Sequence, residues 1–459
     1  GFPAHWMVGG ASRWEFPGIP MNVLMYINRY LGIAFALDGG RHPGRPAGRH
    51  GFFAQQDMRN KSAQQITRCV PGLPRGRDSW IGCLAALVWT LIPMAAGGVD
   101  TVVFRRSGQE HTVGGRVLVT AQDGGLLLLG RDGLLWAIPP EEQIKTTRDD
   151  SPFRPLSREE LAGQLLRVLP TGFQVHETAN YLVCYNTSKV YAQWCGALLE
   201  RLFSAFLNYW QQRGLELSKP EFPLVAIVFA DRKSYEDFSR PELGEAAPSI
   251  VAYYSLMTNR MTMYDLTGVE QWGGGSAARS RLGPNQITQI LARPEAERTV
   301  ATIIHEATHQ IAFNCGLHQR LSDCPLWVSE GIAIYFETPD LHSAKGWRSI
   351  GAINRPRLAQ FYTYLPRRPP DSLRTLIEKD ERFRNPQTGL DAYAEAWALT
   401  YFLLKQRPKQ YVEYLQQISR KKPLVWDKPE TRLREFQSAF GQDLQALDAE
   451  FLRFMAKLR

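Results

Sequence analysis

Two histidines four residues apart, His305 and His309, constrain this chain more than any other feature of its sequence. If the segment is helical, both imidazoles lie on one face, one turn apart, and can reach a single metal ion. Neutral imidazole nitrogen suits zinc, and a catalytic zinc site needs three protein ligands with one position left open. The spacing therefore predicts a helix that supplies two of three ligands, with Glu306 between them.

Glu330, in the segment Trp-Val-Ser-Glu-Gly, is the third ligand that we expect, which gives a site of two histidines and one glutamate. Glu306 is then in place to act as general base toward an attacking water. The bare pattern His-Glu-x-x-His arises by chance in roughly one chain in a hundred of this composition. Two alternatives stay open here: ordinary helix histidines beside a surface carboxylate, or a metal site without catalysis.

The flanking residues predict two helices joined by a loop. Residues 295–315 carry an apolar stripe at spacings of three and four, and Gly316 follows as a helix-ending glycine. A second helix is expected over residues 326–337, after a loop that contains Pro325. Two adjacent helices joined in this way can bring Glu330 to the histidines. The apolar stripe consists of Val300, Ile303, Ile304, Ala307 and Ile311.

The longer strings His-Glu-Ala-Thr-His-Gln-Ile-Ala-Phe-Asn-Cys-Gly and Pro-Leu-Trp-Val-Ser-Glu-Gly-Ile-Ala resemble the gluzincin zinc metallopeptidases. More particularly, they resemble a bacterial family called domain of unknown function 1570, seen mostly in planctomycetes. The resemblance runs from about residue 181 to the C-terminus. It implies an α+β, thermolysin-like (zincin) fold with a mixed sheet and a C-terminal helical subdomain. It also implies zinc as cofactor, His305, His309 and Glu330 as ligands, and Glu306 as base.

The resemblance implies two further roles. Gluzincins pair the substrate backbone with an edge strand just before the active-site helix, and we expect that strand at residues 260–265. They also use a Tyr or His from the C-terminal helices to stabilise the oxyanion. Tyr393 is our candidate for this donor, with an ordinary core tyrosine as the alternative and His318 as a weaker choice.

The chain departs from the thermolysin pattern at one position. Thermolysin-like sites carry an Asp four residues after the ligand glutamate, and it orients a ligand histidine. Here that position is Ile334. The partner of the histidine must therefore come from elsewhere, and Glu337 or Asp340 could serve.

Residues 58–98 have the pattern of a secretory signal peptide. Basic residues precede an apolar run over 81–96, which ends in small residues. The run is shorter than the roughly twenty residues that span a bilayer, so we expect cleavage and no stable membrane insertion, with a retained anchor as the alternative. The mature protein would be exported to the periplasm, cell envelope or exterior of a bacterium. If Met58 is the true start, residues 1–57 are misannotated or disordered upstream sequence.

The net charge of the chain is unevenly distributed. Lys and Arg number 54 and Asp and Glu 45, but ten and four of these lie up to Gly98, leaving 44 against 41 beyond it. The part after Gly98 is therefore close to neutral, and no run of basic residues with interleaved aromatics occurs. The sequence does not predict nucleic-acid binding.

Four cysteines follow Gly98, and an exported chain permits disulfides. Cys315 and Cys324 flank the loop between the two ligand helices, where a bridge would fix the metal geometry. Buried thiols are the alternative. The four are Cys184, Cys195, Cys315 and Cys324.

The chain divides by pattern into successive parts. Residues 99–144 alternate like short strands separated by Gly-Gly and Asp-Gly turns, which predicts a small all-β module. Residues 145–178 are expected to be a polar linker and a short helix opened by a capping box at Ser157. The metallopeptidase domain would span 179–459, with an upper β/α part over 179–337 and a helical part over 338–459.

These patterns together predict an exported zinc-dependent metallopeptidase that acts on a peptide or protein. The first alternative is an inactive zinc-binding module of the cell envelope. The second is a zinc hydrolase acting on a non-peptide amide. Glu306, the expected base, argues against the inactive module. No oligomeric state follows from the sequence.

Overall fold

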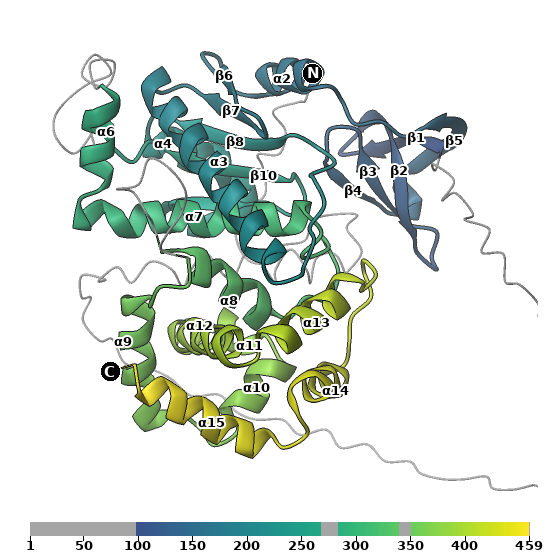
Figure 1. Cartoon of the computed structure of the whole chain (residues 1–459). Helices are drawn as coiled ribbons and strands as arrows, with labels where there is room; N and C mark the ends of the chain where they lie inside the picture. The colour runs from purple at the N-terminus through teal and green to yellow at the C-terminus, as the bar shows by residue number, and fades with distance from the viewer. Residues whose placement is uncertain (1–97, 268–282, 339–349, 459) are drawn as a thin grey trace, which may run out of the picture. The chain divides into compact units, whose positions relative to one another are not determined.

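The computed structural model describes residues 98–267, 283–338 and 350–458 (Figure 1). An antiparallel sheet comes first, a mixed sheet with covering helices follows, and the remainder is helical, so the protein is of the mixed α+β class. The expected signal peptide, apart from Gly98, and the residues before it lie outside the described residues. No helix in the described part of the chain is both long enough and apolar enough to span a membrane.

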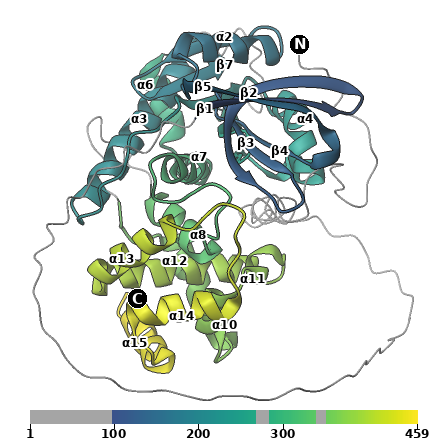
Figure 2. The same ribbon diagram turned by 90° about the vertical axis from the view of Figure 1, so that its right-hand side faces the viewer.

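The first sheet is the expected all-β module, with strand order β4-β3-β2-β1-β5 and antiparallel pairing throughout. Figure 2 shows its long β1–β2 hairpin. Gly108, Gly124 and Gly133 have positive φ and form the turns between strands. The strands are β1 (Gly98–Arg106), β2 (Gln109–Thr120), β3 (Leu126–Gly130), β4 (Leu135–Ile138) and β5 (Gln143–Pro152), with the short helix η2 (Pro140–Glu142) before β5.

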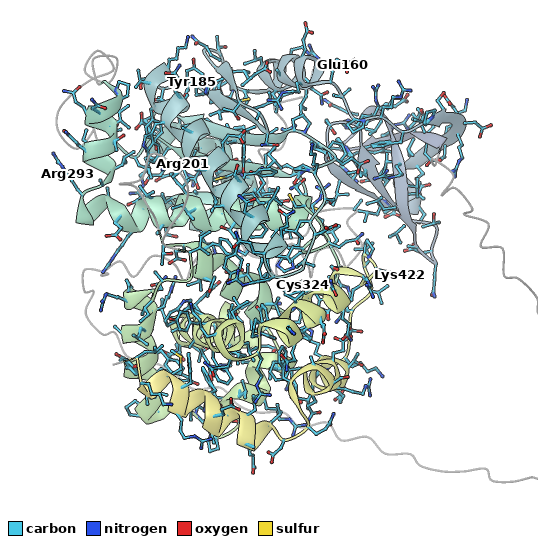
Figure 3. The ribbon with its side chains drawn as sticks, viewed as in Figure 1. Glu160, Tyr185, Arg201, Arg293, Cys324 and Lys422 are labelled. Atoms are coloured by element: carbon cyan, nitrogen blue, oxygen red, sulfur yellow. The ribbon has the colours of Figure 1, made fainter. Side chains whose placement is uncertain are left out.

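The strand β5 corrects the polar linker that we expect in the first part of residues 145–178, from 145 to 155. Most of those residues pair with β1 through backbone hydrogen bonds. From Lys145 on, the side chains of β5 are exposed. Their polarity therefore reflects a solvent-facing edge strand. A polar composition is common to linkers and to exposed edge strands, so the sequence pattern alone does not distinguish them. The helix predicted next is confirmed as α2 (Arg158–Val168), where Ser157 and Glu160 form the capping box. Glu160 is labelled in Figure 3.

The second sheet is mixed, with strand order β6-β7-β8-β10-β9. β8 is buried along its whole length and runs parallel to both β7 and β10, as its continuous apolar sequence predicts. β6 and β9 are the antiparallel edges. The strands are β6 (Gln174–Glu177), β7 (Tyr181–Tyr185), β8 (Leu224–Phe229), β9 (Ala252–Tyr254) and β10 (Arg260–Tyr264).

The order of these strands shows that the expected edge strand was assigned to the wrong segment. Residues 260–265 contribute β10, which lies between β8 and β9. The edge next to the histidine helix is β9 instead. The sequence places both strands before that helix, and only their pairing partners decide which of the two is outermost.

Helices cover both faces of this sheet because successive strand side chains point to opposite sides. Tyr181, Val183 and Ala226 pack into the same core as α3 and α7. Leu182 and Val225 face the other side and pack with α2 and α4. The covering elements are α3 (Lys189–Gln211), α4 (Arg232–Leu243), η3 (Gly244–Ser249), α6 (Pro284–Leu291) and α7 (Pro294–Asn314).

The helical region begins with α8 (Leu326–Phe336), in which every residue is buried. α8 packs against α7 on one side and α12 on another, so it connects the sheet region to the C-terminal helices. The remaining elements are α9 (Arg355–Tyr364), η4 (Leu365–Arg367), α10 (Ser372–Glu378), α11 (Glu381–Arg384), α12 (Gly389–Gln406), α13 (Pro408–Ser419), α14 (Pro429–Phe440) and α15 (Leu444–Ala456).

Candidate metal centre

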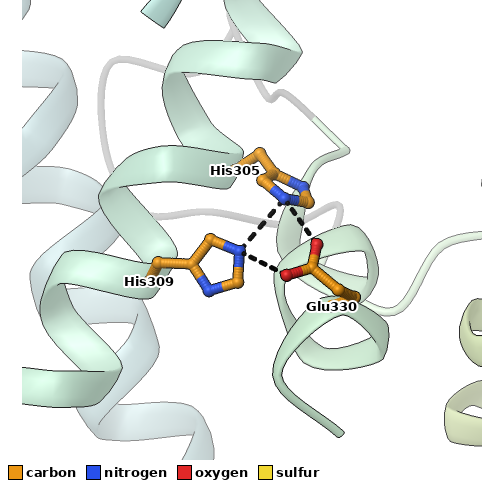
Figure 4. A group of neighbouring side chains, drawn as sticks. All are labelled: His305, His309 and Glu330. Carbon is orange, nitrogen blue, oxygen red and sulfur yellow. Dashed lines mark hydrogen bonds and ion pairs between the residues drawn. The ribbon is translucent and has the colours of Figure 1, made fainter. Parts of the chain in front are cut away.

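The side chains of His305, His309 and Glu330 converge between α7 and α8 (Figure 4). The two Nε2 atoms lie 3.1 Å apart, and His305 Nε2 lies 3.1 Å from Glu330 Oε2. His309 Nε2 lies 3.3 Å from Glu330 Oε1. Ligand atoms on tetrahedral zinc, with bonds of about 2.1 Å, stand about 3.4 Å from one another. The spacing of these three groups therefore fits a single zinc-sized cation.

A second observation supports the fit of a cation. Within the described residues, Glu330 Oε1 is a buried oxygen without a hydrogen bond, because its approach to His309 lacks the geometry of one. A buried carboxylate oxygen left in this state is costly unless a cation or donor satisfies it. His305 and Glu330 are 0% exposed and His309 is 6% exposed, so water is largely kept from all three.

The electrostatics of the cluster favour positive charge at its centre. Burial lowers the pKa of His305, but hydrogen bonds to Glu330 and Glu337 outweigh it and raise the pKa to about 10. Burial raises the pKa of Glu330, yet the imidazoles of His309 and His305 hold it at about 2. Two carboxylates around one imidazole are the surroundings expected where a cation binds.

Glu337 orients His305. It takes the place of the aspartate that thermolysin-like sites carry at the position of Ile334. Its Oε2 lies 3.0 Å from His305 Nδ1. Its Oε1 accepts a hydrogen bond from Asn354 at 3.3 Å and lies 3.8 Å from Arg357. Glu337 is the residue directly after α8, seven residues or about two helical turns beyond Glu330, which places it on the same side as Glu330. Asp340, the other candidate, lies outside the described residues.

Glu306 is held by the edge strand. Its Oε2 accepts a hydrogen bond of 2.9 Å from the backbone N–H of Tyr254 in β9. The side chain is 8% exposed, and burial is the largest cause of its raised pKa. A general base works best with a pKa near the operating pH, so a raised carboxyl pKa suits that role.

Tyr393 lies on α12 and is buried, packed edge-on against Phe383. Burial raises its pKa well above the usual value, and the negative charges of Glu330 and Glu306 raise it further. The fold therefore brings the phenol within electrostatic range of the ligand and the expected base. Its role as oxyanion donor stays a prediction.

His318, the weaker choice for that donor, occupies a different environment. It is 2% exposed, and its Nδ1 lies 3.6 Å from the sulfur of Cys324. Burial lowers its pKa to about 3, and His309 lowers it as well. His318 is thus a buried neutral imidazole that lies near His309 but is not one of the three side chains of the triad.

A bridge between Cys315 and Cys324, one of the two alternatives that the sequence leaves open, is not formed. Both are buried free thiols, as are Cys184 and Cys195. Burial raises the pKa of Cys315 to about 12. Cys324 is labelled in Figure 3 at the loop that precedes α8. The buried-thiol alternative is the one that the structure supports.

An ion cluster that the sequence does not indicate holds the loop before α8. Arg432 of α14 is 2% exposed and donates to Asp323 at 2.9 Å and to Asp380 at 3.0 Å. Asp380 also accepts a hydrogen bond of 3.1 Å from the backbone N–H of Leu326, the first residue of α8. This Arg432 cluster fixes the N-terminal end of the helix that carries Glu330. The three residues are far apart in sequence, and no motif connects them.

The residue after Glu330 determines how closely α8 approaches α12. A Cβ added at Gly331 would stand 2.8 Å from the carbonyl oxygen of Ala396 and would overlap Thr400 Oγ1. A side chain at this position would push the two helices apart. Glycine is therefore required by the packing next to the ligand.

The fold and this cluster define an α+β protein with a possible metal-binding triad. Residues 299–425 match the model of a family described as "Protein of unknown function (DUF1570)". The match includes all three triad residues, Glu306 and Tyr393, and it supports the DUF1570 family for this chain. No curated protein matches the sequence.

Proposed function

We propose that this protein is an exported zinc metallopeptidase of the gluzincin type, with a thermolysin-like fold. The observation that carries the proposal is the convergence of His305, His309 and Glu330 within 4.8 Å. A convergent set of two imidazoles and one carboxylate is the ligand set of zinc peptidases. Export rests on the pattern of residues 58–98 alone.

When bound by the triad, zinc would supply a Lewis acid and a water of lowered pKa. Glu306 would accept the proton of the attacking water and deliver it to the leaving amine. The backbone N–H of Tyr254 keeps one oxygen of Glu306 in place, so the carboxylate is oriented before substrate arrives. Glu337 holds the ring of His305 through Nδ1, which leaves Nε2 directed at the metal position.

Two features favour a peptide as the substrate. β9 is an edge strand, and an extended peptide can add to such an edge through backbone hydrogen bonds. The same strand donates to Glu306, so a peptide paired there would lie beside the base. Tyr393, from α12, is our candidate donor to the oxyanion.

The second candidate is a zinc-binding module without catalysis. The observation in its favour is burial, since the triad and Glu306 are all between 0% and 8% exposed. A structural metal site is closed, whereas a catalytic site keeps one position open to water. A hydrolase that uses the same residues on a non-peptide amide is a variant of the first candidate.

One experiment separates these candidates. The chain from Gly98 onward is purified, its zinc content is measured, and a peptide library is incubated with wild type and Glu306→Gln. Cleavage that falls at least about a hundredfold in the variant, with zinc retained, is the expected result. Stoichiometric zinc without cleavage dependent on Glu306 would establish the binding module instead.

A further inference from the structure

The all-β module has a pocket that is built from residues other than those of the metal centre. Its volume is about 410 Å³, within the range of small-ligand pockets. One wall is β2, another is the turn from β3 to β4, and the third includes Leu156 and Gln164. The chemistry of the lining comes mainly from His111, Thr112, Arg131, Asp132, Trp136 and Gln164.

The walls are fixed to one another, so the pocket is formed before any ligand binds. Gln164 of α2 donates to Asp132 Oδ2 at 2.7 Å. The backbone N–H of Leu156 donates to the carbonyl of Arg131 at 2.8 Å, and the Arg131 side chain donates to the carbonyl of Arg154 at 2.8 Å. A pocket whose walls are joined in this way needs little ordering on binding, which favours affinity.

An aromatic group forms one side of the pocket. Phe104 is fully buried and stacks on His111, with ring centroids 5.1 Å apart. Trp136 lies against the same pair, 5.6 Å from Phe104 and 6.2 Å from His111. Trp136 and His111 are both partly exposed and line the pocket, while Phe104 supports them from below. Trp136 therefore contributes aromatic surface, held in place by its ring neighbours, to the lining of the pocket.

The polar side of the pocket is close to neutral. Arg131 and Asp132 are adjacent and opposite in charge. His111 adds no charge near neutral pH, because burial and the neighbouring Arg106 lower its pKa. A carboxylate has about four acceptor positions, and the two bonds from Leu134 and Gln164 use only two of them. The lining offers several hydrogen-bonding groups without a net field that would select an anion or a cation.

We propose that this pocket binds a carbohydrate, with the flat face of one sugar ring on Trp136 and its hydroxyls bonded to Asp132 and Gln164. A sugar is the common ligand that combines an apolar C–H face with a neutral rim of hydroxyl groups. A phosphate or a peptide carboxylate would meet the Asp132 carboxylate beside the Arg131 guanidinium and would gain no net attraction. A purely apolar ligand would leave the polar groups unpaired. The pocket makes the β module a glycan-binding unit, independent of the metal centre.

The test titrates the full chain with three neutral trisaccharides, triacetylchitotriose, cellotriose and maltotriose, by calorimetry, with and without EDTA. At least one is expected to bind with a Kd below roughly 10 mM, unchanged by EDTA. Trp136→Ala should weaken binding about tenfold or more, as loss of a central tryptophan contact does. Trp194→Ala is the matched control, since Trp194 is a half-buried tryptophan on α3 that stacks on Tyr191.

A second variant, Thr112→Trp, tests the pocket even if Trp136→Ala does not fold. Thr112 is exposed at the pocket rim, so a larger side chain there should block the pocket without disturbing the core. It should abolish binding while the circular dichroism spectrum stays that of wild type. The proposal is overturned if none of the sugars binds, or if binding survives both pocket variants. Saturable binding of sodium phosphate or acetate that is lost in both pocket variants would also overturn it, in favour of an anion site.

Discussion

Two buried polar clusters contact α8, one at its N-terminal end and one near its middle, and they differ in how their charges are satisfied. At the N-terminal end, Arg432 supplies positive charge to Asp323 and Asp380 through four hydrogen bonds, so all four carboxylate oxygens have a donor. Farther along the helix, the triad gathers two imidazoles around Glu330, whose Oε1 lacks a hydrogen bond within the described residues. The first cluster is complete within the chain, whereas the second leaves an oxygen that the proposed cation would satisfy.

This difference assigns the two clusters to different tasks. A complete buried ion cluster is strongly destabilised when one partner is removed, because the others are left buried and uncompensated. A ligand cluster loses its cation when one member is removed, but the chain can still fold around the remaining groups. We therefore expect substitutions in the Arg432 cluster to change folding stability and substitutions in the triad to change metal binding.

The largest effect is expected at the triad. Glu330→Gln should weaken zinc binding on the order of a thousandfold or more, because a neutral amide replaces the charged ligand. Glu337→Gln should keep zinc with roughly 10- to 100-fold lower affinity, since it alters only the partner of His305. Competition with a fluorescent chelator measures both. Equal affinities for the two variants would contradict the assignment of Glu330 as ligand.

The next effect concerns the Arg432 cluster. Arg432→Met should lower the free energy of unfolding by about 3–5 kcal/mol, because Asp323 and Asp380 stay buried without their hydrogen-bonded cation. The next cations, Lys421 and Arg384, each lie 3.9 Å from one of the two carboxylates. Arg434→Met on the same helix is the control, since Arg434 is exposed. Urea unfolding followed by circular dichroism gives both values. A loss below about 1 kcal/mol for Arg432→Met would show that this cluster is not the stabilising one.

A smaller effect, on turnover alone, is expected at α12. Tyr393→Phe should reduce kcat about a hundredfold, about 2.7 kcal/mol, if the phenol donates to the oxyanion. Zinc affinity should stay within about twofold, because Tyr393 is not a ligand. Tyr401→Phe, on the same helix and 7% exposed, is the control. Near-normal turnover in Tyr393→Phe would leave it as a core tyrosine.

The smallest effect that we expect is a loss of folding stability at low pH, caused by His318 near the triad. The pKa of His318 is lowered to about 3 in the folded protein, whereas an unfolded histidine titrates near 6.5. Between these values only the unfolded chain takes up the proton, so stability falls as pH drops. From pH 8 to pH 5 this histidine should cost about 2 kcal/mol. Unfolding curves of His318→Gln should show that much less loss over the same range, and parallel curves would disprove it.

The sequence correctly predicted those helices and strands that are specified by the residues within their own segment. The boundaries of α7 and α8 follow from apolar spacing, Pro325 and Gly316, and β8 follows from an unbroken apolar run. The triad could be predicted because the chemistry of zinc restricts both the residue types and their spacing on helices. Glu337 could be narrowed to one of two candidates, but only its contact with His305 distinguishes it.

The errors fall where pairing between distant segments decides the structure. β5 was expected to be a linker because exposed edge strands and linkers share a polar composition. The edge strand was wrongly predicted at residues 260–265, which form the inner strand β10. Strand order depends on the pairing of the whole sheet and cannot be predicted from either strand alone. Arg432, Asp323 and Asp380 come from three separate segments, and each looks like an ordinary surface charge in its own context.

The adjacent residues Glu330 and Gly331 are each required for a different reason. The glutamate is dictated by chemistry, but the glycine is dictated by the carbonyl of Ala396 and the hydroxyl of Thr400 on the neighbouring helix. A related chain that keeps both histidines and the glutamate but has alanine in place of this glycine would carry the whole triad and still misplace its glutamate. When relatives are screened for a working centre, this glycine therefore deserves the same weight as the ligands themselves.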